Sequence, residues 1–343
     1  MRYIRLGRTE LMVSAASFGA LPIQRVSFGE AAALVRRALA GGVNYFDTAN
    51  AYTDSEEKLG AALEGVPRGS YVLSSKSGAS DYEGVLAQVE LSLRRLRTDY
   101  IDILQLHNPD PLPDAEDPHG TYAALAEARR RGWIRFIGVT SHGLDRAQAA
   151  VASGKYDTLQ FPFCLLSSER DIALARQCRD ADMGFIAMKG MSGGLIRDAR
   201  AASVFIRRYP WVVPIWGVQR MSELEEFLRY EEEPPADDGA IAESVARERA
   251  ALSGDFCRAC GYCLPCPAGI DIPQCARRRY FLMRSPVPPQ MTDAVRGDML
   301  RIRDCRHCRV CASRCPYGLD TPRLLQENLA YYLDFYEAYH RTL

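Results

Sequence analysis

The chain has 343 residues, and its 43 basic and 43 acidic residues give a formal net charge of zero. This balance gives no indication of binding to nucleic acid or to a charged membrane surface. No apolar run approaches the ~18 residues that a membrane-spanning helix needs, and the first residues lack the apolar core of a secretory signal. The sequence therefore predicts a soluble, cytoplasmic protein with one large core and a smaller module.

The first 230 residues alternate between short apolar runs and amphipathic helical patterns. Residues 3–19 predict a short hairpin, with its turn at 6–11, and a first strand over 13–18. Further strands are predicted at 45–47, 71–75, 101–107, 134–140, 158–161, 185–189 and 213–217. Helices are predicted at 28–40, 54–63, 81–97, 120–131, 144–153, 168–182, 196–209 and 222–230. Eight strand–helix units of this size fit an α/β fold of the (β/α)8 barrel type. An open doubly wound sheet is the alternative, but no G-x-G-x-x-G follows the first strand.

The pattern breaks after the barrel. Residues 231–239 are acidic and contain prolines, which predicts a linker, and a helix is predicted at 241–253. The predicted domains are thus a barrel at 1–230, a linker with a connecting helix at 231–253, and a cysteine-rich domain at 254–343. The long spacer between the cysteine runs predicts a mainly helical module that ends in a helix at 322–339. Its arginine run at 277–279 is interpreted as a solvated face.

Four ionisable side chains close or closely follow three of the predicted strands: Asp47, Tyr52, Lys76 and His107. Because the carboxyl ends of the strands meet at one rim of a parallel barrel, we expect these side chains to converge. Taken singly, each has a plainer interpretation as a helix cap, a solvated lysine or a loop histidine. Taken together, they favour a catalytic site.

These residue types suit the interconversion of a carbonyl and an alcohol. A phenol donates a proton to a carbonyl oxygen as hydride reaches the carbon, but its reference pKa of about 10 makes it slow. The ammonium of Lys76 would stabilise the phenolate and lower the pKa of Tyr52, and Asp47 would hold the lysine. His107 would orient the substrate oxygen or relay the proton.

Nine of the eleven cysteines fall between positions 257 and 315, while Cys164 and Cys178 lie earlier. A local cluster in a chain without an export signal indicates metal ligation rather than disulfides. The clustered cysteines form two runs, Cys257-x2-Cys260-x2-Cys263-x2-Cys266-Pro267 and Cys305-x2-Cys308-x2-Cys311-x3-Cys315-Pro316.

Three cysteines at this spacing, followed by a Cys-Pro pair, are typical of proteins that hold two [4Fe-4S] clusters and exchange fourth ligands. The pattern predicts that Cys315 completes the cluster of the first run and that Cys266 completes the cluster of the second. The first run departs by one residue from the ferredoxin spacing, so Cys275 is an alternative to Cys266. Structural zinc, which commonly takes two C-x2-C pairs, is the competing interpretation of the whole module.

Residues 1 to about 230 resemble the aldo-keto reductase family. The matching segments are Leu-Gly-Arg-Thr at 6–9, Asp-Thr-Ala-Asn-Ala-Tyr at 47–52, Ser-Glu-Glu-Lys-Leu-Gly at 55–60, Lys76, and Leu-His at 106–107. The resemblance implies a (β/α)8 barrel that binds an extended nicotinamide dinucleotide without a Rossmann motif. It also implies that Tyr52 is the general acid and that Asp47, Lys76 and His107 support it.

The resemblance further implies cofactor contacts, with several departures from the family pattern. Ser141 replaces an asparagine, Met188 replaces a stacking tyrosine, and Phe227 replaces the asparagine after Glu226. The basic residues that the family places at a 2′-phosphate are poorly matched, and Arg220 is the nearest candidate. NADPH is still favoured, with NADH as the alternative. The implied cofactor residues are Thr140, Ser141, Gln160, Met188, Lys189, Gly190, Gly194, Gly217, Arg220 and Glu226.

Nearly the whole chain resembles aldo-keto reductases with a C-terminal ferredoxin-like extension. The first hypothesis is an NAD(P)H-dependent oxidoreductase acting on a small carbonyl or alcohol, with clusters in a structural, regulatory or electron-transfer role. The alternative is an electron-transfer or redox-sensing protein that works with a partner redox protein. A nicotinamide moves two electrons as hydride whereas a cluster moves one, so direct exchange would need an intermediary such as a flavin. The sequence has no recognisable flavin site.

Overall fold

The computed structural model describes residues 1–252, 256–259, 261, 263–284, 287–315 and 317–341. Residue contacts group the chain into two compact units. Unit 1 contains Met1–Met191 and Asp198–Val245, and unit 2 contains Ser192–Arg197 and Ala246–Leu343. The domain boundaries expected near residues 230 and 254 stay predictions.

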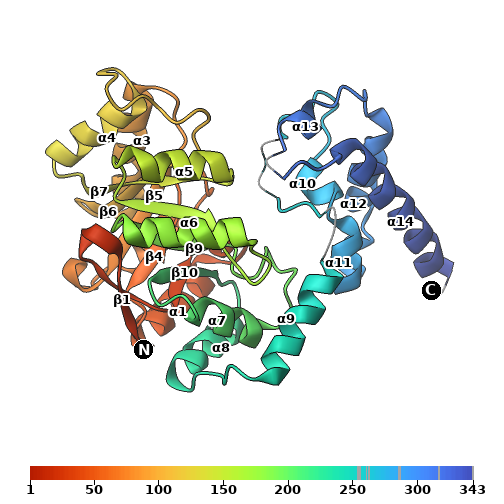
Figure 1. Ribbon diagram of the computed structural model, residues 1–343, viewed down its shortest axis with the longest axis horizontal. Helices are drawn as coiled ribbons and strands as arrows, with labels where there is room; N and C mark the ends of the chain where they lie inside the picture. The colour runs from red at the N-terminus through yellow and green to blue at the C-terminus, as the bar shows by residue number, and fades with distance from the viewer. Residues whose placement is uncertain (253–255, 260, 262, 285–286, 316, 342–343) are drawn as a thin grey trace. The chain divides into compact units, whose positions relative to one another are not determined.

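Eight parallel strands of unit 1 close into a barrel, in the order β10-β3-β4-β5-β6-β7-β8-β9 (Figure 1). Their apolar runs are short and buried on both faces, as parallel strands covered by helices require. The predicted barrel is confirmed. The strands are β3 (Ser17–Gly19), β4 (Tyr45–Asp47), β5 (Val72–Ser77), β6 (Ile101–Leu106), β7 (Ile134–Thr140), β8 (Thr158–Pro162), β9 (Gly184–Met188) and β10 (Val212–Gly217).

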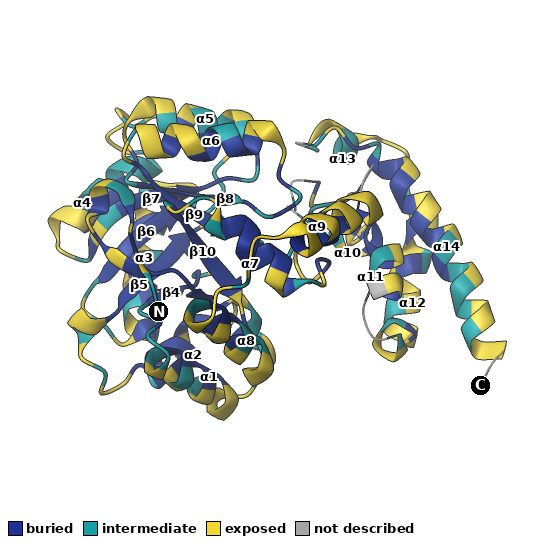
Figure 2. Cartoon of the chain, turned by 60° about the horizontal axis from the view of Figure 1, so that its bottom comes forward, coloured by how far each residue is buried: buried dark blue, intermediate teal, exposed yellow. Residues whose placement is uncertain are grey.

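Eight helices of unit 1 follow these strands, and Figure 2 shows buried strands with outer helices whose outward faces are exposed. Two of the helices begin with a capping box, at Ser27 and Glu30 and at Ser168 and Asp171, which satisfies free backbone N–H groups. The helices are α1 (Phe28–Ala40), α2 (Ser55–Ala62), α3 (Tyr82–Leu96), α4 (Thr121–Arg130), α5 (Leu144–Ser153), α6 (Glu169–Asp180), α7 (Ala199–Arg207) and α8 (Met221–Glu232).

A hairpin of β1 (Tyr3–Arg5) and β2 (Met12–Ser14) covers the N-terminal end of the barrel. Its residues Leu6 and Val13 belong to one buried cluster with Tyr45 and Val72, the first residues of β4 and β5. The hairpin is as predicted, but the single strand expected over 13–18 is divided into β2 and β3. The Ser17 hydroxyl donates to the Ser14 carbonyl at 2.6 Å, which fixes the turn between them.

Helix α7 also begins later than the predicted residue 196. The Asp198 carboxylate accepts a hydrogen bond from the Ala201 N–H at 2.9 Å, so Asp198 is the N-cap and helical geometry starts at Ala199.

The regular secondary structure described in unit 2 is all helical, as predicted, and loops connect the helices. Its longest helix, α14 (Thr321–Arg341), packs against the shorter helices, and its Tyr332 is fully buried and donates to the Gln290 carbonyl at 3.2 Å. No helix in the described part of the chain is long and apolar enough to cross a membrane. The other helices here are the end of α9 (Gly239–Ala251), α10 (Ile272–Cys275), α11 (Arg278–Arg284), α12 (Asp293–Leu300) and α13 (Val310–Ser313).

The expectation that residues 277–279 form a solvated face is wrong for two of the three arginines. Arg277 and Arg278 are each only 6% exposed. Arg277 donates to the carbonyls of Ser192 and Gly193 at 3.2 and 3.5 Å, and Arg278 donates to the Gln290 side chain at 2.5 Å. A guanidinium is buried when acceptors of this kind replace its water.

Candidate active site and iron–sulfur sites

Asp47 and Lys76 form a buried ion pair at the carboxyl ends of neighbouring strands. Lys76 Nζ lies 2.6 Å from Asp47 Oδ1 and also donates to the Thr48 carbonyl at 2.6 Å. The side chains are 3% and 1% exposed, respectively. Burial of this kind is costly for an isolated charge, so the two groups depend on each other.

Tyr52 and His107 lie beside this pair. Lys76 Nζ is 5.2 Å from the centre of the Tyr52 ring, and the Tyr52 and His107 rings meet edge to face at 5.8 Å. Both rings are partly exposed, whereas Asp47 and Lys76 are buried. The structure thus brings all four predicted residues together, with the phenol and the imidazole as the accessible members.

The turn that carries Tyr52 is fixed by bonds to neighbouring strands and loops. The Thr48 and Asn50 N–H groups donate to the carbonyls of Ser74 and Lys76 at 2.9 and 3.1 Å. Beyond the turn, the Ser55 hydroxyl donates to the Ala20 carbonyl at 2.8 Å. The segment at 55–60 therefore supports the position of Tyr52.

Two residues that were not predicted complete the surroundings of Asp47. Its Oδ2 accepts hydrogen bonds from the Ser74 hydroxyl at 2.7 Å and from Gln105 Nε2 at 3.3 Å. Each precedes a predicted residue by two positions, Ser74 before Lys76 and Gln105 before His107. Because strand side chains alternate between faces, this spacing was the signal that could have identified them.

The pKa values of the two accessible groups shift in opposite directions. Burial raises the pKa of the Tyr52 phenol, and the Lys76 charge opposes this rise. Burial, together with the Lys76 charge, lowers the pKa of His107 to about 4. At neutral pH the site therefore presents a protonated phenol and a neutral imidazole.

Residues expected near a nicotinamide carboxamide lie at the ends of β7 and β8. Thr140 is 2% exposed, and its hydroxyl has no hydrogen-bond partner. The Ser141 hydroxyl donates to the Gly143 carbonyl at 2.9 Å, and Gln160 Oε1 accepts from Gln105 Nε2 at 3.0 Å. Buried polar groups normally have a hydrogen-bond partner, so the unsatisfied Thr140 hydroxyl is suited to bond the amide of a bound ligand.

The glycine-rich segment after β9 is divided between the two units. Met188 ends the strand and Lys189 has a left-handed φ of 61°. A Cβ on Gly190 would lie 2.5 Å from the Trp216 ring, so only glycine fits there without a shift. Gly194, with φ of 87°, belongs to unit 2. The expected loop is therefore not a single feature of the barrel.

Residues expected near the adenosine end are paired with neighbours. Gly217 is exposed at the end of β10, but Arg220 is bound to Glu223 at 2.6 Å, and Glu226 accepts from the Tyr230 hydroxyl at 2.6 Å. Arg25 lies nearby, since its Nη1 is 3.5 Å from the Gln219 side chain. Arg25 is thus a second basic residue beside this loop, contributed by a distant part of the sequence.

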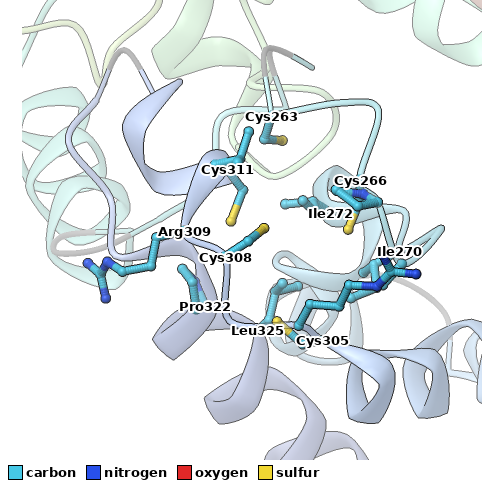
Figure 3. Close-up of a pocket in the computed structure, with 14 residues that line it drawn as sticks. Cys263, Cys266, Ile270, Ile272, Cys305, Cys308, Arg309, Cys311, Pro322 and Leu325 are labelled. Atoms are coloured by element: carbon cyan, nitrogen blue, oxygen red, sulfur yellow. The ribbon is translucent and has the colours of Figure 1, made fainter.

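In unit 2, one pocket collects the second cysteine run. Cys305, Cys308 and Cys311 line it together with Cys266 and Cys263, around about 410 Å³ of space that is partly open to solvent. Figure 3 shows the sulfurs of Cys308 and Cys311 turned toward this space. The remaining lining is largely apolar, with Ile270, Ile272, Val310, Pro322 and Leu325 among its members.

A second pocket collects the first run. Cys257, Cys263 and Cys315 line it, and the predicted ligand Cys260 lies outside the described residues. Cys263 and Ile272 line both pockets, so the two pockets are neighbours. The fourth cysteine of each run thus lies with the other run.

Comparison with known proteins assigns both parts of the chain. Residues 14–208, more than half of the sequence, match the model of the aldo/keto reductase family. The chain belongs to the aldo/keto reductase family. Residues 256–320 match the model of a 4Fe-4S dicluster domain.

Relatives of this aldo/keto reductase include L-galactose dehydrogenase of Arabidopsis thaliana, 39% identical over 155 residues, which are 41% of this chain and 48% of the plant enzyme. Aldo-keto reductase YhdN of Bacillus subtilis is 30% identical over 175 residues, which are 47% of this chain and 52% of that enzyme. The chain thus spans about half the length of these relatives. The solved aldo-keto reductase AKR11C1 of Bacillus halodurans, in its holo form, has 20% identity and a TM-score of 0.63 over 72% of this chain and 96% of its own. It shows the shared fold.

The backbone of this aldo/keto reductase repeats itself in the two cysteine runs. Ala259 and Gly261, around the second cysteine of the first run, have φ values of 52° and 88°. His307 and Arg309, around Cys308, have φ values of 51° and 57°. Left-handed backbone costs a non-glycine residue of the order of 1 kcal/mol and persists where its surroundings require it. Both runs have the same unusual backbone conformation around their second cysteine, which is consistent with two sites of the same kind.

The donor set of the second cysteine run, which the structure describes completely, favours a cluster over a single ion. No three or more histidine, cysteine or acidic residues of the described chain lie close enough to hold one metal ion. A tetrahedral zinc needs its ligands around a single point, whereas each iron of a [4Fe-4S] cluster takes one thiolate, which spreads the sulfurs around the group. The residues therefore fit the cluster type named for the matching domain.

Cys275 lines neither pocket. It is fully buried, its sulfur lies 3.6 Å from the Asp298 carbonyl, and burial raises its pKa to about 12. Cys266 rather than Cys275 lies at the pocket of the second run.

Proposed function

We propose that this aldo/keto reductase interconverts a carbonyl and an alcohol in a small molecule, with Tyr52 as general acid and base. The observation that carries the proposal is the buried Asp47–Lys76 pair, 2.6 Å apart, beneath the accessible rings of Tyr52 and His107. The proposed cofactor is NADPH, which supplies hydride to the carbonyl carbon when bound.

Each of the four residues has a separate part in the proposed reaction. Tyr52 donates its phenolic proton to the carbonyl oxygen as that oxygen gains negative charge. Lys76 stabilises the resulting phenolate, because its charge opposes the rise in the pKa of Tyr52. Asp47 fixes Lys76, and neutral His107 hydrogen-bonds the substrate oxygen.

Several residues support binding of the proposed cofactor. The unsatisfied Thr140 hydroxyl would accept or donate to the nicotinamide carboxamide, with Ser141 and Gln160 beside it. Arg220 and Arg25 would meet the 2′-phosphate, which favours NADPH over NADH. Arg220 would exchange its exposed ion pair with Glu223 for the phosphate at small cost, since such pairs contribute little.

The proposed substrate is an aldehyde, a ketone or a sugar-like alcohol. The sugar class is supported by the similarity to the plant L-galactose dehydrogenase. An assay should therefore include hexoses as well as simple aldehydes.

We also infer that unit 2 holds two [4Fe-4S] clusters. Cys305, Cys308, Cys311 and Cys266 would hold one cluster, and Cys257, Cys260, Cys263 and Cys315 would hold the other. The two cysteine-lined pockets and their repeated backbone conformation support this assignment.

Replacement of Tyr52 by phenylalanine tests the reaction. Tyr52→Phe keeps the ring but removes the proton, so kcat/KM for carbonyl reduction should fall by about 10²–10⁴-fold, while the Kd for NADPH stays unchanged. Stopped-flow absorbance of NADPH and fluorescence titration measure these two quantities. Tyr122→Phe is the matched control, because it loses only a hydrogen bond to the Lys155 carbonyl. Undiminished turnover in Tyr52→Phe would exclude the proposed role.

A further inference from the structure

Cys308 is the exposed cysteine among those that the structure describes; the others are buried or partly buried. It lines the pocket of the second run, which is partly open to solvent. Electron transfer slows steeply with distance, so a cluster bound to an exposed ligand exchanges electrons most readily at that ligand. Cys308 therefore marks the side of unit 2 at which a cluster comes nearest to an outside molecule.

The surface around Cys308 is basic. Arg306, His307 and Arg309 flank it and are all exposed, and both arginines line the same pocket. Figure 3 shows Arg309 extending away from the pocket. Its nearest ion-pair partner is Asp320, which directly precedes α14, and Arg309 Nη1 lies 3.5 Å from Asp320 Oδ1. This single carboxylate balances only part of the positive charge of the surface.

The charge continues along the same segment. Arg301, Arg303 and Arg314 are also exposed, and Asp304 is the single acidic residue between 301 and 314. Residues 246–343 contain fifteen arginines, no lysine and ten acidic residues, although the whole chain is neutral. The positive charge is thus concentrated in unit 2, and part of it surrounds the exposed cysteine.

We propose that this surface docks an acidic one-electron carrier protein of the flavodoxin type. The proposal rests on the proposed function, in which Cys266, Cys305, Cys308 and Cys311 hold a [4Fe-4S] cluster. In the exchange, the reduced carrier loses one electron and the cluster gains it; no covalent bond forms or breaks. Complementary charge steers such encounters and raises the association rate.

The cluster proposed for the first cysteine run extends the electron path inward. Cys263 and Ile272 line both pockets, so the electron can pass from one cluster to the next. The described cysteines at this cluster are less exposed than Cys308, and Cys263 is only 9% exposed. The carrier therefore docks at the cluster of the second cysteine run, and the cluster of the first run receives the electron from it.

A protein carrier explains the position of the basic surface better than a nucleic acid does. The arginines flank a ligand of a redox group, and a nucleic acid has no electron to exchange with it. Nucleic acid binding therefore enters the test as a competing outcome.

The test uses the complete, cluster-loaded protein under anaerobic conditions, with a purified acidic flavodoxin as the probe. Calorimetry gives the Kd at several salt concentrations, and stopped-flow absorbance gives the rate at which reduced flavodoxin bleaches the clusters. The variant Arg306→Glu/Arg309→Glu should weaken binding and slow bleaching by about tenfold or more at low salt. Added salt should weaken wild-type binding and reduce the difference.

The matched control is Arg94→Glu/Arg130→Glu, which reverses two exposed arginines of α3 and α4 in unit 1. The Kd of this control for flavodoxin and its rate of cluster bleaching should both stay close to those of the wild type. If Arg306→Glu/Arg309→Glu loses iron, Arg303→Glu/Arg314→Glu replaces it, since those residues line neither pocket. Equal binding by the patch variants and the control would overturn the proposal, as would tighter binding of a DNA duplex that displaces flavodoxin.

Two further measurements separate this proposal from the proposed function. Iron and sulfide analysis shows whether the clusters are present, and carbonyl reduction with NADPH shows whether the Tyr52 chemistry operates. A protein that holds its clusters and reduces carbonyls, but ignores flavodoxin, contradicts the docking surface alone.

Discussion

Asp47 uses both carboxylate oxygens, one for Lys76 and the other for Ser74 and Gln105. A buried carboxylate with a single partner would keep much of its desolvation cost, and each added donor offsets part of it. The Ser74 hydroxyl also accepts from the Tyr45 phenol at 2.9 Å, so the bonds continue into the barrel interior. This network gives Lys76 one fixed position beneath Tyr52.

The pKa of His107 predicts a pH dependence of stability. Its value of about 4 in the folded protein lies below the ordinary 6.5, so the unfolded chain binds a proton more readily. The contribution of neutral His107 is therefore complete above pH 6.5 and is lost as the pH falls toward 4. Urea unfolding, followed by tryptophan fluorescence, should show stability declining over this window.

The variant His107→Gln isolates this contribution, because it keeps a polar side chain but cannot titrate. Its stability should decline less steeply between pH 6.5 and 4 than that of the wild type. Lys76 and His142 act electrostatically on or beside His107 and are present in both proteins, so their effects cancel in the comparison. Identical slopes for the two proteins would contradict the assigned pKa.

Cysteine replacements distinguish ligands from bystanders. Cys305→Ser should reduce bound iron to about half, because one of two clusters loses a ligand. Cys275→Ser is the matched control and should retain all of its iron, since Cys275 lines neither pocket and bonds to the Asp298 carbonyl. Iron and sulfide analysis under anaerobic conditions gives the result. Loss of iron in Cys275→Ser would make that residue a ligand.

At the residue scale, the sequence predicted the side chains that end strands but not the partners that hold them. Lys76 and His107 follow apolar runs, which is a visible signal, whereas Ser74 and Gln105 sit inside such runs and look like ordinary strand residues. The pairing of Arg220 with Glu223 depends on a short i, i+3 contact that competes with any ligand. These outcomes depend on side-chain geometry, which a pattern of residue types does not contain.

At the scale of elements, most helices and strands were predicted closely because their periodicity is regular. Helix α1 (Phe28–Ala40) and strand β7 (Ile134–Thr140) have the predicted bounds. The errors occur where a single polar side chain decides the boundary, as Asp198 does for α7 and Ser17 does for β3. Apolar patterning says where an element exists, and capping says where it begins.

Two helical glycines should respond in opposite ways to alanine. A Cβ on Gly60 of α2 would lie 2.3 Å from the Arg95 carbonyl of α3, so Gly60→Ala should destabilise unit 1 by about 1–3 kcal/mol. A Cβ on Gly29 of α1 would meet nothing within 4 Å, so Gly29→Ala should stabilise it by up to about 1 kcal/mol.

Urea midpoints measure both glycine variants. All three tryptophans, Trp133, Trp211 and Trp216, belong to unit 1, so their fluorescence reports this unit alone. An unchanged or raised midpoint in Gly60→Ala would show that the α2–α3 approach does not require glycine at position 60.

At the scale of the whole molecule, the change in composition after residue 230 indicated two parts of different character. It did not indicate that Ser192–Arg197 groups with the cysteine-rich part. That grouping depends on Arg277, which donates to two carbonyls of the segment, and on Arg197, which donates to the Met283 carbonyl at 2.7 Å. Partners more than eighty residues apart leave no local pattern in a sequence.

The grouping of Ser192–Arg197 has a consequence for modular exchange. The polypeptide passes between the units three times, after Met191, Arg197 and Val245, rather than once as in a simple tandem fusion. To join the cysteine-rich part to another barrel, two pieces would therefore have to be transferred: the six-residue loop at 192–197 and residues 246–343. Conversely, a barrel truncated at Val245 would keep the loop but lose Arg277 and Met283, to which it is bonded.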